Sequence, residues 1–159
     1  MDELAIVRAL HVFAIILWIG GVGFVTTVLL PAVRRLKAPE ERLAFFDGIE
    51  RRFAWQARIT TLLAGLTGLD MVIRLDLWDR FLMRAYWWMS AMVLVWLIFS
   101  AMLFIAEPLF LHRWLAARAA RAPEATFVLV ERLHWLLLTL SLLTALGAVA
   151  GAHGLAWPG

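Results

Sequence analysis

Hydrophobic residues form four long stretches along the chain, at about residues 4–30, 55–75, 86–111 and 127–152. Each stretch is near or above the ~20 residues that an α-helix needs to cross ~30 Å of hydrocarbon. The short segments between them favour antiparallel neighbouring helices. The pattern therefore predicts an all-α fold: a single domain over residues 1–159, built as an integral membrane four-helix up-down bundle.

The longest polar segment separates the first two stretches and carries a pattern of its own. We expect Pro31 to close the first span. Apolar side chains then recur at helical spacing, at Leu43, Phe46, Ile49 and Phe53. A helix with one apolar face can lie in the membrane interface. The segment is thus expected to form a short cytoplasmic interfacial helix between spans 1 and 2.

Composition supports the membrane assignment. The chain is 64% hydrophobic and only 17% charged over 159 residues, too apolar for a soluble domain of this length. The N-terminus opens with Asp2 and Glu3, and the first stretch is longer than a signal-peptide core, so we expect it to remain as a transmembrane helix. The chain has no cysteine, which excludes disulfides, thiolate metal ligands and thiol nucleophiles.

The basic residues are distributed unevenly between the two sides of the predicted bundle. Most lie between spans 1 and 2 or between spans 3 and 4, and the positive-inside rule places those segments in the cytoplasm. Both termini are then expected outside. This distribution explains the net charge of +3 without a nucleic-acid partner. Tryptophans at the predicted span ends fit the aromatic belts of a membrane protein, with lipid as its surroundings.

Histidines occur in two pairs, one at each predicted membrane face. His11 and His153 lie near the outer ends of spans 1 and 4, and His112 and His134 lie near the cytoplasmic ends of spans 3 and 4. Two imidazoles from different helices are the ligand set of a six-coordinate haem b. We therefore expect a haem b site at His11 and His153, with a second candidate site at His112 and His134. Hydrogen bonding of these histidines to carbonyls, water or lipid is the alternative.

Two other ligand sets compete with haem. Glu131 and His134 stand three residues apart on one helix face and, with Glu107, form a candidate metal site on the cytoplasmic side. Pairing of the two glutamates with Arg51, Arg52, Arg113 or Arg132 is the simpler alternative. Copper is the other option, through the thioethers of Met89 and Met92 together with His11 and His153. Ordinary bundle packing would equally explain both methionines. Asp70 and Arg74, four residues apart, are expected to form a local ion pair.

The first hydrophobic stretch carries His11, then Trp18, Gly20 and Gly21, and is followed by Pro31. With these residues it resembles the opening helix of the CopD and HemJ-like membrane proteins. The resemblance implies a four-helix protein of the bacterial inner (cytoplasmic) membrane, with His11 associated with haem. The CopD side of the resemblance implies copper handling.

A looser similarity to the HemJ group lies in the third stretch. The Trp-Met-His-Ala-Lys pattern of that group reads Trp88, Met89, Ser90, Ala91 and Met92 in this chain. Serine and methionine thus replace the histidine and the lysine. This departure disfavours protoporphyrinogen oxidation as the activity, and whether the chain is an enzyme stays open.

The leading functional hypothesis from sequence is a membrane haem b-binding protein that transfers electrons with quinone or a membrane redox complex. Copper handling is the second hypothesis. The third is a non-catalytic membrane subunit, packed in a larger complex or as a homo-oligomer. The glycines of span 1, with Gly147 and Gly151 of span 4, would either clear room for a porphyrin or allow close helix packing.

Overall fold

The structure is a computed structural model that describes residues 3–154, and every regular element in that range is helical. Several helices run on without a break, so that four long helical rods result. The elements are α1 (Glu3–Phe24), the π-helical η1 (Val25–Leu29), α2 (Leu30–Leu36), α3 (Pro39–Arg74), the 3-10 turns η2 (Trp78–Leu82) and η3 (Arg84–Tyr86), α4 (Trp87–Ala101), the π-helical η4 (Met102–Leu111), α5 (His112–Ala119) and α6 (Pro123–Ala152). The all-α four-helix prediction is confirmed for the described residues.

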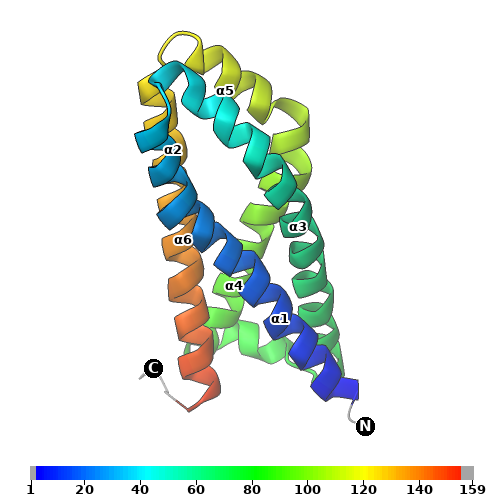
Figure 1. Ribbon diagram of the computed structural model, residues 1–159. Helices are drawn as coiled ribbons and strands as arrows, with labels where there is room; N and C mark the ends of the chain where they lie inside the picture. The colour runs from blue at the N-terminus through cyan, green and yellow to red at the C-terminus, as the bar shows by residue number, and fades with distance from the viewer. Residues whose placement is uncertain (1–2, 155–159) are drawn as a thin grey trace.

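The four rods lie side by side in an elongated bundle (Figure 1). α1 crosses one face diagonally, between α3 on one side and α6 on the other, with α4 behind it. The first turn of α1 and the last turn of α6 lie at the same end of the bundle but on opposite sides of it. We call this the terminal end. The other end holds the α2–α3 and α5–α6 turns with most of the arginines, and we call it the basic end.

α1 makes its most extensive contact with α3. α1 buries one stripe, Ala14, Trp18 and Val22, at four-residue spacing, as one face of a helix requires. α3 packs Ala64, a small residue that is almost fully buried, in the same cluster as that stripe. Small residues let helix backbones approach closely, and in lipid such packing takes the place of the hydrophobic effect.

The segment predicted as a separate interfacial helix is instead the first part of α3. α3 begins at Pro39 and continues without a break to Arg74. Leu43 and Phe46 are only 7% and 3% exposed, because they pack in the core of the basic end with residues of η1, α2, α5 and α6. The same helical spacing serves burial in a bundle or in a membrane surface, so the pattern alone did not distinguish the two.

Two prolines lie inside rods, whereas Pro39 and Pro123 begin α3 and α6. Pro31 lies in the first turn of α2, directly after the π-helical η1, so the expected end of the first span at this residue was wrong. Pro108 lies inside the π-helical η4. Proline removes a backbone donor and crowds the preceding turn, and a local widening of the helix accommodates both effects.

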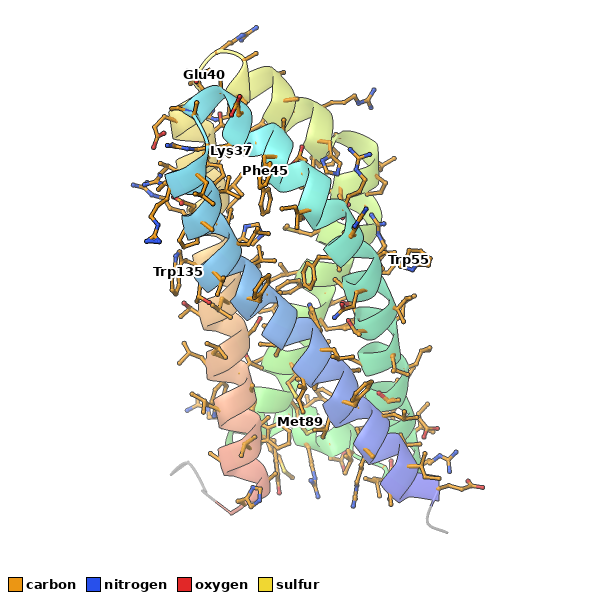
Figure 2. All side chains as sticks on the ribbon, in the orientation of Figure 1. Lys37, Glu40, Phe45, Trp55, Met89 and Trp135 are labelled. Carbon is orange, nitrogen blue, oxygen red and sulfur yellow. The ribbon has the colours of Figure 1, made fainter. Side chains whose placement is uncertain are left out.

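Three of the four rods are long and apolar enough to cross a membrane: Glu3–Leu36, Arg84–Ala119 and Pro123–Ala152. α3 is not among them, and its second half contains Gln56, Arg58, Asp70 and Arg74. Residues 55–75 as a fourth span therefore stay a prediction. Large apolar side chains face outward, including Leu66 and Leu146, each 66% exposed. Trp55 likewise points away from the bundle (Figure 2) and is 64% exposed. Such a surface suits a lipid bilayer.

The glycines of α6 make room for indole rings. Gly147 and Gly151 lie against Trp87 and Trp88 of α4, and a Cβ added at Gly147 would sit 2.7 Å from the Trp87 ring. Gly65 of α3 similarly faces Trp96, whose indole N–H donates to the carbonyl of Thr61 at 2.8 Å. These glycines therefore serve helix packing through tryptophan, and no porphyrin is needed to explain them.

Candidate functional site

Glu107 is a buried carboxylate in the third rod, with 7% of its surface exposed. Its Oε1 lies 3.0 Å from Nη2 of Arg58 on α3 and 3.5 Å from Nε2 of His112 on α5. An ionisable side chain is expensive to place within an apolar helix bundle unless it is paired, and such residues commonly mark proton or ion pathways. Glu107 is therefore the centre of the candidate site.

Arg58 holds η4 through the backbone as well as through Glu107. In a π-helix each N–H bonds to the carbonyl five residues earlier, and Pro108 has no N–H to offer Leu103. Arg58 supplies the missing donor, because its Nε donates to the Leu103 carbonyl at 3.1 Å. One guanidinium thus satisfies both the carboxylate and the carbonyl that the proline leaves without a backbone donor.

Two further carboxylates of α3 complete the site. Nδ1 of His112 lies 3.7 Å from Oδ2 of Asp47, and Glu50 follows Asp47 by one helical turn. Burial, together with the negative charges of Glu107 and Asp47, raises the pKa of Glu50 to about 7, against the opposing effects of His112 and Arg58. Burial also raises the pKa of Asp47 above its usual value. We call Asp47, Glu50, Arg58, Glu107 and His112 the acid cluster.

The second predicted pair of histidines is divided by the fold. His112 belongs to the acid cluster, whereas Nδ1 of His134 bonds to the Val130 carbonyl of its own helix at 2.9 Å. The His134 ring forms a T-shaped pair with the ring of Phe46. Glu131, expected beside His134 as a ligand, pairs instead with Arg34 at 2.9 Å. The structure does not bring Glu107, Glu131 and His134 together.

A second ion-pair network explains the position of Glu131. Arg34 of α2 and Arg42 of α3 both pair with Glu124 in the first turn of α6. These ion pairs therefore join three rods at the basic end, where exposure to water weakens each pair. The four arginines expected as partners of Glu107 and Glu131 are not the ones used. Asp70 and Arg74 do form the expected ion pair, at 2.9 Å, and Arg74 also reaches Glu3.

His11 contacts α3 rather than α6. Its Nδ1 lies 3.0 Å from the Ala64 carbonyl and 3.0 Å from Oγ1 of Thr67, and its ring packs against Gly68. A carbonyl only accepts, so this bond places the proton on Nδ1 and leaves Nε2 with a free lone pair in the neutral ring. A histidine that ligates a metal has this orientation, and so does a histidine that only hydrogen-bonds to neighbouring residues.

His153 does not share a site with His11 in this fold. It is exposed at the end of α6, where its Nδ1 bonds to the Val149 carbonyl of its own helix at 2.8 Å. α1 and α6 diverge toward the terminal end, where α1 lies beside α3 (Figure 1). The two histidines therefore have no common partner in the structure, and a haem held between them stays a prediction.

The methionines proposed as copper ligands lie on α4. Met89 is buried inside the bundle (Figure 2) and Met92 is half-buried. Within residues 3–154 no group of three or more histidine, aspartate or glutamate side chains has the geometry to hold a metal ion. Copper binding stays a prediction.

Asp47, Glu50 and Arg58 are the residues that sequence reasoning did not assign to a site. A signal for them does exist. Arg58 is a charged residue inside a predicted span, and Asp47 and Glu50 precede it by eleven and eight residues, which places all three near one face of a helix.

Comparison of the chain with protein-family models, with curated proteins and with solved structures finds no match. The resemblance to the CopD and HemJ-like proteins therefore rests on the sequence motifs alone.

Proposed function

We propose that the protein exchanges protons at the basic end of a membrane bundle, as the proton-handling part of a redox or transport reaction. The observation that carries the proposal is the buried carboxylate of Glu107, held by Arg58 and His112 inside a proline-containing π-helix. π-helical segments are frequent at functional sites. Carboxylates and histidines in series are the usual components of proton relays in membrane proteins.

The acid cluster contains a group suited to proton exchange at neutral pH. A group with a pKa near the working pH is present in both protonation states and passes protons most effectively. Burial and neighbouring negative charge bring the pKa of Glu50 to about 7. Glu50 lies on α3 between the first turn, at the basic end, and Arg58, which pairs with Glu107. We expect it to pass protons between water at that end and the buried carboxylate.

Infrared spectroscopy of the protein in lipid tests this proposal. As the pH rises from about 5 to about 9, the C=O stretching band of protonated carboxyl groups is expected to disappear with a midpoint near 7, because Glu50 loses its proton in that interval. Glu50→Gln should remove this component. Glu107→Gln should move the midpoint to lower pH, since the charge of Glu107 is one of the causes that raise the pKa of Glu50.

The exposed Glu40, in the first turn of α3 and outside the cluster, provides the matched control. Glu40→Gln is expected to leave the band and its midpoint unchanged. A spectrum without any carboxyl band that titrates near neutral pH would contradict the proposal. So would a midpoint that Glu107→Gln does not move.

Haem b binding at His11, with electron transfer to quinone or a membrane redox complex, is the second candidate. It is favoured by the Nδ1 bond to Ala64, which leaves Nε2 in position to act as a ligand. A second axial ligand would have to come from a residue other than His153. Protein purified from haem-replete cells is expected to show a Soret band that His11→Ala abolishes and His153→Ala preserves. A colourless preparation would eliminate this candidate.

A further inference from the structure

A groove of about 490 Å³ lies between α1, η1 and α3, away from the acid cluster. Its volume is in the range of small-molecule sites, about 300 to 1,000 Å³. α3 contributes Ile49, Arg52, Phe53 and Gln56, whose spacing places them on one helical face. Glu50 belongs to the neighbouring face, so one helix serves both the groove and the acid cluster.

The wall formed by the first rod is apolar and contains two glycines with different surroundings. A Cβ added at Gly21 would meet the ring of Phe53, whereas one added at Gly20 would meet no atom within 4 Å. The lack of a side chain at Gly20 therefore leaves the groove open, and the lack of one at Gly21 makes room for the Phe53 ring, which forms the floor of the groove. The lining runs from Ile16 to Leu29, or about 20 Å along the helix at ~1.5 Å per residue. Because Phe53 meets Gly21, Arg52 lies near the middle of this length, and the part from Gly21 to Ile16 offers an apolar surface to the first part of an acyl chain.

The charge of the groove is positive and unbalanced. Arg52 is exposed at its rim, no acidic residue lines it, and within residues 3–154 Arg52 has no carboxylate within 4.0 Å. Trp55, three residues further along α3, faces outward where a belt tryptophan would mark the membrane interface. Arg52 is thus placed at headgroup level, with the apolar trough extending from it toward the bundle centre.

We propose that this groove binds one anionic phospholipid of the surrounding bilayer, with an acyl chain beside Gly20 and the headgroup phosphate at Arg52. Guanidinium groups pair readily with phosphate, and basic pockets between membrane helices are typical sites for anionic lipid headgroups. A zwitterionic lipid also carries a phosphate, but its own ammonium group already compensates that charge, so the charge of Arg52 would stay unbalanced. The proposal is independent of the acid cluster, because neither Gly20 nor Arg52 belongs to it.

Native mass spectrometry of the full chain tests the site with phosphatidylglycerol and phosphatidylcholine of identical acyl chains. The unmodified protein is expected to retain one phosphatidylglycerol with at least fivefold preference over phosphatidylcholine. Gly20→Phe should reduce retention of either lipid at least fivefold, because its ring fills the trough. Arg52→Gln should lower the retention of phosphatidylglycerol to that of phosphatidylcholine.

Matched variants separate the site from general effects. Gly48→Phe places the same ring at another exposed, unobstructed helical glycine, and Arg35→Gln removes an exposed basic charge elsewhere at the basic end. Both should retain the lipid and its selectivity, with helix content by circular dichroism equal in all variants. Equal retention of both lipids, equal effects of Gly20→Phe and Gly48→Phe, a co-purified quinone in the groove, or a dimer that covers it would overturn the proposal.

Discussion

Arg58→Met is expected to lower the free energy of unfolding by about 3 to 5 kcal/mol, the usual loss when one partner of a buried ion pair is removed. The substitution leaves the carboxylate of Glu107 buried without its cation. It also removes the hydrogen bond that Arg58 donates to the carbonyl of Leu103, for which Pro108 has no N–H to offer. Reversible unfolding in mixed detergent micelles, followed by circular dichroism, measures the change.

A double-mutant cycle identifies the cause of that loss. Adding Glu107→Gln to Arg58→Met is expected to restore part of the stability, because a neutral amide is less costly to bury than an unpaired carboxylate. Arg74→Met, at an exposed ion pair on the same helix, is the control and should have a much smaller effect. Equal losses for Arg58→Met and Arg74→Met would show that the Glu107 pair is not structurally important.

Glu50 is expected to make the folded protein less stable as the pH rises from about 4.5 to about 7. Below this interval the carboxyl group is protonated in both states. Within it the unfolded chain has released the proton, while the folded protein still holds it, because burial raises the pKa of Glu50 to about 7. The folded state binds more protons there, so stability falls as the pH rises and levels off above the folded pKa.

Glu50→Gln should therefore stabilise the protein at pH 8 by on the order of 2 to 3 kcal/mol, since each tenfold change in proton affinity corresponds to about 1.4 kcal/mol. At pH 4 the two proteins should differ little. Unfolding curves recorded at both pH values measure the difference, and Glu40→Gln provides the comparison at an exposed position of the same helix. A stabilisation by Glu50→Gln that is equal at pH 4 and pH 8 would refute the raised pKa.

Features that depend on neighbours in the chain were predictable from the sequence. Hydrophobic length alone located the apolar rods, and the four-residue spacing of Asp70 and Arg74 was enough to predict their ion pair. The prediction of a separate interfacial helix was wrong for a related reason. The spacing of Leu43 and Phe46 correctly indicated a helix, but it contained no information on whether bundle or bilayer would cover the apolar face.

Features that depend on how the rods cross were not predictable. The depth of a residue along its helix follows from counting, whereas its partner on another helix depends on tilt and rotation. His11 and His153 share the terminal end, yet the diagonal course of α1 turns His11 toward α3. Glu107 was correctly singled out as an unusual residue, but its partner proved to be Arg58 rather than an arginine of the basic segments.

The length of α3 has a practical consequence for imaging. Its 36 residues extend about 54 Å at ~1.5 Å per residue, and the predicted fourth span, which begins at residue 55, accounts for about 30 Å of that length. Roughly 20 Å of rigid, interlocked helix should therefore stand clear of a detergent micelle, held together by the core around Phe46 and Phe127. For a chain of 18.0 kDa, that fixed projection supplies an epitope for an antibody fragment and a landmark for aligning particles in electron cryo-microscopy.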